Sequence, residues 1–180
     1  MNFEFVPMNL EYAKEIINNW NYEGKYNIYS YVNEKEFLLD KETWGLGRFA
    51  VLNEKNDIIG ELTIEFFREN SEDEEDEGYV KHEIVKNTLE EKYEMWVGWG
   101  LKPELCGIGL GKKFVDACVK FALKEYDYNG EYIRCGVAEF NKRAIKVYER
   151  AGFKVFNTSV GEIEKNEYRI LSMRKKINME

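Results

Sequence analysis

The 180-residue sequence has a single histidine, His82, and three cysteines. They form no cluster at the spacing of a metal site, so metal catalysis has little support. Cys106, Cys118 and Cys135 are an odd number in a chain without a secretion signal, which argues against a disulfide framework. We therefore expect no bound metal and three reduced thiols.

A long apolar run is also missing, as is a basic N-terminal stretch followed by an apolar segment. A membrane-spanning helix needs about 20 apolar residues, and a secretion signal needs both of those N-terminal features. We expect a cytoplasmic protein that has no membrane partner.

Positive charge is in deficit, since the formal net charge is −8. That balance disfavours nucleic acid and anionic membranes as partners. Residues 69–77 hold seven of the acids, and without them the rest of the chain has a net charge of −1. Because like charges repel and do not pack, we predict a solvated loop at about 69–78. The alternative is a rim that attracts a cationic substrate.

Apolar side chains are plentiful, at 44% hydrophobic and 15% aromatic, which suits one core and a single domain over residues 1–180. Periodicity predicts strands and helices in the order that follows. We expect a strand at 3–8, helices at 9–20 and 34–39, a hairpin at 48–67, a strand at 95–101, a helix at 108–126, a strand at 131–138, a helix at 141–152, and closing strands at 153–160 and 167–176.

This order predicts an α/β (α+β) fold with a mixed sheet and helices on both faces. Residues 79–93 are ambiguous between strand, helix and excursion. The tyrosine-rich segment from Trp20 to Tyr31 has weak periodicity, and its aromatic rings either pack against the sheet or line a pocket.

Three glycines at every second position, Gly107, Gly109 and Gly111, come directly before Lys112 and the helix predicted at 108–126. Glycine suits a sharp turn or a close approach of backbone to another molecule. A glycine loop at a helix start presents free N–H groups at the positive end of the helix dipole, which favours phosphate or another anion. The alternative is a tight turn packed against a neighbour.

Two known phosphate loops do not match this segment. A Walker loop needs a hydroxyl residue after its lysine, and Phe114 follows the lysine pair here. A dinucleotide fold needs GxGxxG and an acidic residue about 20 positions further on, whereas the spacing here is GxGxG.

Residues 98–122 and 141–155 resemble the acyl-coenzyme A signature and the following helix of the GCN5-related N-acetyltransferases (GNAT). In that family a [Q/R]xxGx[G/A] loop binds the coenzyme pyrophosphate through main-chain N–H groups. Its last two named positions match Gly109 and Gly111, while Cys106 departs from the first and removes one polar side chain. The family's asparagine and tyrosine map onto Asn141 and Tyr148, which lie on one helix face with Ala144.

The resemblance implies a single GNAT domain with a mostly antiparallel central sheet, acetyl-coenzyme A as acyl donor and a primary amine as acceptor. It implies these coenzyme-binding residues: Trp99, Leu101, Cys106, Gly107, Ile108, Gly109, Leu110, Gly111, Lys112, Asn141, Ala144 and Tyr148. The Trp20–Tyr31 segment is then expected to form the acceptor wall, because the coenzyme motifs lie in the other half. For the oligomeric state, a homodimer is one of the alternatives.

Acyl transfer from a thioester to an amine needs a proton acceptor, stabilisation of the developing oxyanion, and a proton for the thiolate. We expect Tyr148 to donate that proton and backbone N–H groups near Gly98 and Gly100 to hold the carbonyl oxygen. Three carboxylates are candidates for the base, namely Glu61, Glu65 and Glu94. The predicted function is an N-acetyltransferase acting on a small molecule or a protein; the alternative is an acyl-coenzyme A-binding sensor or scaffold without turnover.

Overall fold

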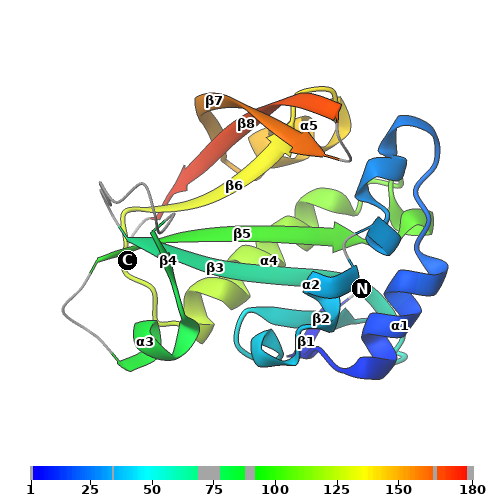
Figure 1. Cartoon of the computed structure of the whole chain (residues 1–180), viewed down its shortest axis with the longest axis horizontal. Coiled ribbons are helices and arrows are strands. Elements are labelled where there is room, and N and C mark those ends of the chain that lie inside the picture. Colours follow the sequence, from blue (N-terminus) through cyan, green and yellow to red (C-terminus); the bar gives the residue numbers. More distant parts are fainter. Residues whose placement is uncertain (1, 34, 69–77, 88–91, 164–165, 178–180) are drawn as a thin grey trace.

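A computed structural model describes the chain except for residues 1, 34, 69–77, 88–91, 164–165 and 178–180 (Figure 1). The acidic loop predicted at about 69–78 therefore lies outside the described residues, apart from Gly78. Within the described part, no helix has the length and apolar character needed to cross a membrane.

The helices and strands follow the predicted order closely. They are β1 (Glu4–Pro7), α1 (Leu10–Asn19), α2 (Lys35–Leu39), β2 (Arg48–Leu52), β3 (Ile58–Arg68), β4 (Tyr79–Val80), α3 (His82–Asn87), β5 (Tyr93–Leu101), α4 (Gly111–Glu125), β6 (Tyr132–Ala138), α5 (Lys142–Arg150), β7 (Lys154–Ile163) and β8 (Asn166–Lys176). Four short 3₁₀ turns add η1 (Gly24–Tyr29), η2 (Tyr31–Asn33), η3 (Lys41–Thr43) and η4 (Pro103–Leu105).

The strands form one mixed sheet in the order β1-β2-β3-β5-β6-β8-β7, with β4 paired to β3. Among the described strands, every pairing is antiparallel except the parallel pair β5–β6. The mostly antiparallel mixed sheet predicted from the sequence is confirmed.

Helices cover both faces of this sheet, as the apolar patterns predict. The alternating strand residues Leu62 and Ile64 pack with Phe114 and Cys118 of α4 on one face. On the other face, α1 and α2 bury their apolar stripes against β2 and β3, in a cluster that includes Ile16, Trp20, Leu38, Ala50 and Ile58. Burial on both faces explains why every residue of β2 after Arg48 is apolar, whereas β3 keeps the polar residues Glu61, Thr63 and Glu65 at alternate positions.

Local signals set the helix ends. Asn9 is the N-cap of α1, where its side chain accepts a hydrogen bond from Tyr12 N at 2.9 Å. At the other end of the chain, α5 closes through Gly152, whose φ of 94° is the left-handed backbone typical of a C-terminal glycine.

The segment that sequence patterns left ambiguous, residues 79–93, contains the short elements β4 and α3 and the start of β5. His82 opens α3 and is buried, with its Nε2 2.6 Å from Ile64 O on β3. This contact fixes α3 to the sheet, and it gives His82 a role in packing.

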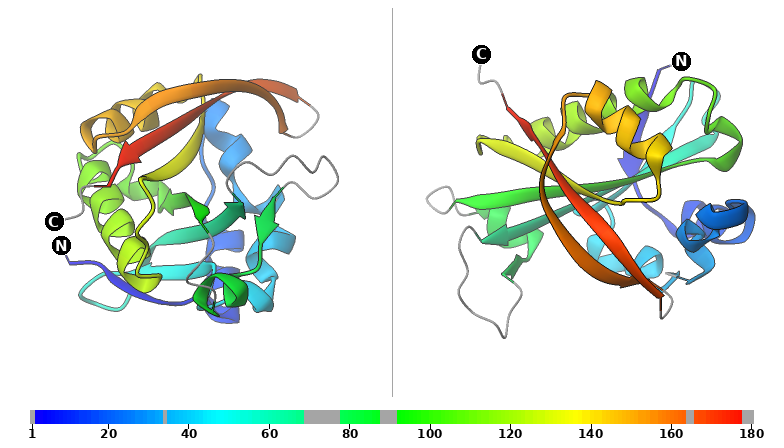
Figure 2. Two further views of the ribbon diagram at one scale, coloured as in Figure 1. Left: turned by 90° about the vertical axis from the view of Figure 1, so that its left-hand side faces the viewer. Right: turned by 90° about the horizontal axis from the view of Figure 1, so that it is seen from above.

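β5 and β6 separate soon after they meet. β5 pairs with β3 from Tyr93 to Leu101, but its described pairing with β6 is limited to Met95↔Ile133 and Trp96↔Arg134. Beyond that point β6 pairs along its length with β8, and β6, β7 and β8 rise away from the rest of the sheet (Figures 1 and 2). The backbone of β5 that points away from β3 after Trp96 is therefore left open to another molecule.

Gly60 in β3 tests how tightly this core is packed. A Cβ atom at residue 60 would lie 2.5 Å from Cε2 and Cζ of the buried Phe114 ring. We expect Gly60→Ala to lower the free energy of unfolding in urea by about 1–3 kcal/mol, because an overpacked core must shift. Gly98→Ala is the matched control, since its Cβ would meet Thr63 Cβ at an ordinary 3.8 Å. Equal stability of the two variants would contradict this packing.

Candidate active site

A cleft of about 790 Å³ lies where β5 and β6 separate. Its walls come from the tyrosine-rich N-terminal segment, β3, β5, the glycine loop, α4, β6 and α5. It brings together most of the residues singled out from the sequence, namely Glu61, Glu65, Trp99, Leu101, Cys106, Gly107, Gly109, Gly111, Lys112, Asn141, Ala144 and Tyr148.

The three loop glycines are there for two different reasons. Gly107 and Gly109 have φ values of 82° and 87°, a backbone that other residues rarely adopt. Gly111 instead allows α4 to approach α5, because a Cβ there would lie 3.0 Å from Cγ2 of Val147. Leu110, the N-cap of α4, has an apolar side chain that cannot accept from the first turn, so those N–H groups need another acceptor.

Four basic side chains also line the cleft, namely Lys112, Arg143, Lys146 and Arg150. Lys112 follows the loop directly, and Arg143 Nη1 lies 4.0 Å from where a Cβ at residue 107 would stand. The Arg143 guanidinium lies over the Tyr26 ring at 4.1 Å from the centroid, which connects α5 to the N-terminal segment. Cations together with open helix N–H groups are the chemistry that binds a diphosphate. These residues fit the phosphates of coenzyme A.

Cys106, which departs from the family pattern, acts as a donor to the backbone. Its thiol donates to Leu101 O at 3.5 Å and to Lys102 O at 3.7 Å. Burial raises the pKa of this thiol, partly opposed by Arg143, so the sulfur stays protonated at neutral pH. The geometry favours support of the loop over nucleophilic catalysis.

Tyr148 lies inside the cleft in direct contact with Trp99. Trp99 Nε1 donates to Tyr148 Oη at 2.9 Å, and the two rings meet edge to face with their centroids 5.3 Å apart. Burial raises the pKa of Tyr148 above its ordinary value of about 10; the neighbouring Cys135 adds to this, and the bond from Trp99 opposes it. At neutral pH the phenol is therefore protonated and available as an acid.

Asn141, on the same helix, is first of all a cap. Its Oδ1 accepts from Ala144 N at 3.1 Å at the start of α5. Because Oδ1 is used in this way, the amide nitrogen is the part of Asn141 suited to contact a ligand.

Another part of the cleft wall is aromatic and acidic. Tyr22, Tyr26, Tyr29 and Tyr31 contribute to its wall, together with Trp96. Tyr22 Oη donates to Leu101 O at 2.9 Å. Burial raises the pKa of Tyr22, and neighbouring acidic groups, Cys106 first and then Glu61, raise it further.

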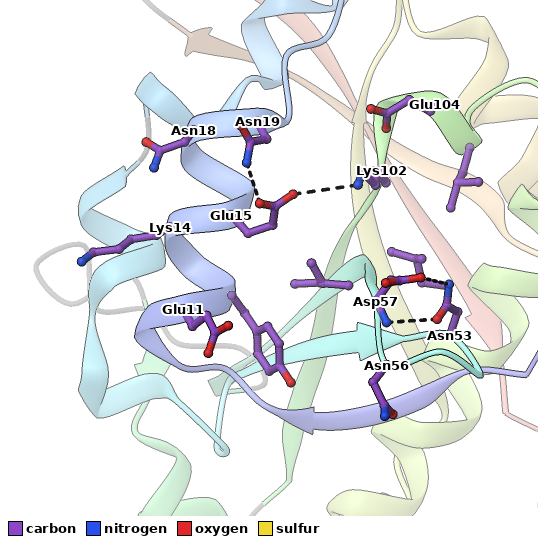
Figure 3. Close-up of a pocket in the computed structure, with 14 residues that line it drawn as sticks. Glu11, Lys14, Glu15, Asn18, Asn19, Asn53, Asn56, Asp57, Lys102 and Glu104 are labelled. Atoms are coloured by element: carbon purple, nitrogen blue, oxygen red, sulfur yellow. Dashed lines mark hydrogen bonds and ion pairs between the residues drawn. The ribbon is translucent and has the colours of Figure 1, made fainter.

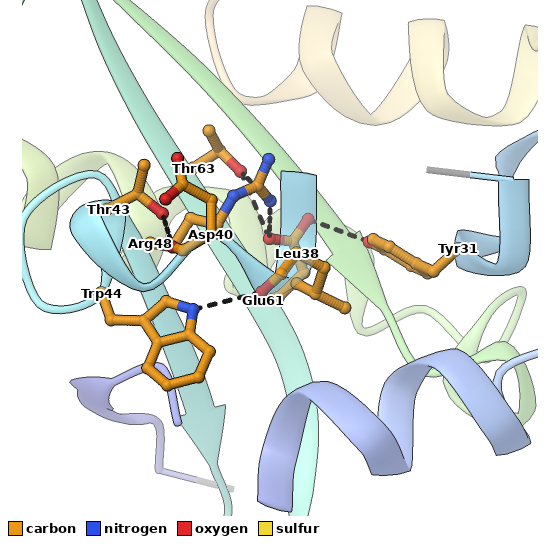
Figure 4. A network of polar contacts seen from close by, with 8 residues as sticks. All are labelled: Tyr31, Leu38, Asp40, Thr43, Trp44, Arg48, Glu61 and Thr63. Atoms are coloured by element: carbon orange, nitrogen blue, oxygen red, sulfur yellow. Dashed lines mark hydrogen bonds and ion pairs between the residues drawn. The ribbon is translucent and has the colours of Figure 1, made fainter. Parts of the chain in front are cut away.

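Glu61, which lines the cleft, is the centre of a buried polar network (Figure 4). The residue is 4% exposed. Tyr31 Oη donates to its Oε1 at 2.9 Å, while Thr63 Oγ1 donates to Oε2 at 3.3 Å and Arg48 Nη1 lies 3.6 Å from Oε2. Arg48 also donates to Thr63 Oγ1 at 3.2 Å. A buried carboxylate held on several sides is fixed in place.

The hydrogen bond from Tyr31 to Glu61 requires a residue without a side chain at position 100. A Cβ at residue 100 would collide with the hydroxyl of Tyr31, which has to pass Gly100 to reach Glu61. The glycines of β5 do not disturb its pairing with β3, which runs through both of them. The open backbone edge comes from the departure of β6.

The three candidate carboxylates lie in different surroundings. Glu61 and Glu65 line the cleft, on the same face of β3. Glu94 lies outside the lining residues, where its Oε1 is 2.9 Å from Arg134 Nη2 and its Oε2 accepts from Trp96 Nε1. Of the three, Glu65 is the exposed one.

Sequence patterns did not identify several residues of the cleft. Arg48 and Thr63 have the pattern of ordinary strand residues. In the hairpin, however, they pair with each other next to Glu61. Arg143 carried no signal beyond its charge, and Cys135 looked like any core residue of β6. Aligning the two strands of the predicted hairpin in register would have placed Arg48 and Thr63 beside Glu61.

A second groove lies on another side of the molecule, between α1, the β2–β3 turn and Lys102 (Figure 3). It shares no lining residue with the cleft. Glu15, near its centre, pairs with Lys102 at 3.9 Å. Its polar groups make contacts with one another, as Asn53 does with Asp57.

Comparisons with known proteins agree with this geometry. A family model described as an acetyltransferase (GNAT) domain matches residues 2–154. Spermidine N-acetyltransferase from Vibrio cholerae, in complex with CoA and spermine, has a TM-score of 0.65 at 18% identity, over 97% of this chain and 95% of that chain. A GNAT-family acetyltransferase from Bacillus anthracis has a TM-score of 0.65 at 12% identity, over 98% and 95%.

At such identities the solved structures establish the fold alone, and a search of curated proteins gives no match. The family model, in contrast, spans the sheet from β1 to the start of β7, and with it the glycine loop, Asn141 and Tyr148. The chain therefore belongs to the GNAT family and is an N-acetyltransferase.

Proposed function

We propose that the protein transfers an acetyl group from acetyl-coenzyme A to a primary amine on a positively charged acceptor, by direct attack on the thioester. One observation carries this proposal: the cleft that holds Tyr148 combines basic side chains with tyrosines and the carboxylates Glu61 and Glu65. The first group suits phosphates and the second suits a cation. The V. cholerae neighbour, bound to CoA and spermine, supports an acceptor of this kind.

In this proposal the coenzyme phosphates bind to the N–H groups of residues 107–112, with Lys112, Arg143 and Lys146 supplying positive charge. The open edge of β5 between Trp96 and Leu101 pairs with the amides of the coenzyme's pantetheine arm, opposite Asn141 and Ala144. The same edge supplies the N–H groups that stabilise the developing oxyanion.

Acetyl-coenzyme A supplies a thioester, and attack by a neutral amine on its carbonyl carbon releases the coenzyme thiolate. Tyr148 donates its phenolic proton toward that sulfur, because burial keeps the phenol protonated at neutral pH. The N-terminal tyrosines exclude water and contact the acceptor.

We propose Glu65 as the group that takes the proton from the amine, directly or through water. It is exposed in the cleft, so the proton can pass to solvent. Glu61 has both oxygens engaged by Tyr31, Thr63 and Arg48, which suits a fixed charge that attracts the cation. Glu94 is engaged by Arg134 away from the cleft, so we do not carry it into this mechanism.

The alternative function, binding acyl-coenzyme A without turnover, depended on the missing polar side chain at Cys106. The backbone donors of the loop do not depend on that side chain, and a protonated Tyr148 in the cleft favours the enzyme.

Gly109→Glu tests the coenzyme end. The new carboxylate would repel the diphosphate, and φ of 87° would strain any side chain there. We expect the calorimetric affinity for coenzyme A to fall at least about 10-fold. Gly152→Glu, at an exposed glycine with φ of 94° outside the cleft, controls for strain and charge. Unchanged affinity in the Gly109 variant would remove the assignment.

Tyr148→Phe tests the acid. The ring and its packing against Trp99 are kept, so coenzyme affinity and stability should change little. Turnover, measured as thiol release with a panel of amines, should fall by about 10²–10⁴-fold if protonation of the thiolate limits the rate. Turnover near the wild-type value would mean that Tyr148 is a packing residue.

The base is tested by comparing Glu65→Gln with Glu94→Gln. Each change removes a charge at nearly constant volume, but only the first lies in the cleft. We expect kcat/KM for the amine to fall by about 10²-fold in the Glu65 variant and by far less in the Glu94 variant. The reverse order would assign the proton transfer to Glu94.

A further inference from the structure

Trp99 makes two kinds of contact with Tyr148. Its indole Nε1–H donates to Tyr148 Oη at 2.9 Å, and its ring meets the phenol edge to face at 80°. Phe153, itself buried, closes the group with centroids 6.0 Å from Trp99 and 6.3 Å from Tyr148. The phenol therefore has one ring position and one fixed hydrogen-bond donor.

This arrangement decides where the phenolic proton points. An indole nitrogen is a donor only, so Tyr148 Oη has to accept from Trp99. Conjugation keeps a phenolic O–H in the ring plane, with two orientations, and the one that faces the indole N–H is repelled by it. The hydrogen of Tyr148 is thus turned away from Trp99, and both residues line the cleft.

The same hydrogen bond also adjusts acidity. Burial raises the pKa of Tyr148, and the bond from Trp99 acts in the opposite direction. A proton donor works best when its pKa is close to that of the group it serves, and a thiol has an ordinary pKa of about 8.5. Loss of the Trp99 donor would make Tyr148 a weaker acid as well as a less well oriented one.

We propose that Trp99 is a positioning residue for acyl transfer, whose indole N–H orients the hydroxyl of Tyr148 toward the leaving sulfur. The proposal rests on the proposed function, in which Tyr148 protonates the thiolate. The family resemblance implies only that Trp99 binds the coenzyme. A purely structural role, in which Trp99 only satisfies a buried hydroxyl, predicts lower stability without a specific effect on the chemical step.

A double-mutant cycle separates these two roles. Wild type, Trp99→Phe, Tyr148→Phe and the double variant are compared by single-turnover acetyl transfer, coenzyme A affinity and thermal unfolding. We expect Trp99→Phe to slow the single-turnover rate about 10-fold with unchanged coenzyme affinity. In the Tyr148→Phe background the same change should have almost no effect on rate, because the group it orients is gone.

Phe153→Leu is the matched packing control, since it disturbs the same aromatic group and keeps the indole donor. It should lower the unfolding temperature and leave the rate within about 3-fold of wild type. If Trp99→Phe does not fold, 3-benzothienylalanine at position 99 keeps the indole shape without the N–H and replaces it in the cycle.

The outcomes are distinct. Equal losses from Trp99→Phe in both backgrounds, or a wild-type rate in that variant, would overturn the positioning role. A wild-type rate in Tyr148→Phe would overturn the proposed function of Tyr148 instead.

Discussion

The separation of β6 from β5 is the constraint on which the site depends. Two strands that pair at Met95 and Trp96 and then part give up a ladder of hydrogen bonds on their facing edges, while on their other edges β5 stays paired with β3 and β6 with β8. What remains is a wedge with one open backbone edge, lined on the far side by α5 and closed at one end by the glycine loop. Every functional group discussed above gains its position from this wedge.

Two kinds of charged group line the wedge. The basic side chains on the first turn of α4 and on α5 stand at exposed helix positions. Glu61 differs from them, because it is buried and costs free energy unless it is paired. Tyr31, Thr63 and Arg48 meet that need, and Gly100 gives Tyr31 the room to do so.

Local sequence signals were sufficient for most elements of the fold. The alternation in β3, the stripe of α4 and the closing glycine of α5 each depend on short-range chemistry and were confirmed. What the sequence could not reveal depends on contacts between distant segments. Gly100 looked like an irregular strand position until Tyr31 was placed beside it, and Trp99 looked like a wall residue until β5 and α5 were set side by side.

The central claim is that the wedge holds the thioester sulfur beside Tyr148, with the diphosphate at the glycine loop. A crystal structure of the protein with coenzyme A tests it most directly. We expect the coenzyme sulfur within hydrogen-bond distance of Tyr148 Oη and the diphosphate on the N–H groups of residues 107–112. A diphosphate bound at that loop with the sulfur beyond the reach of Tyr148 would contradict it.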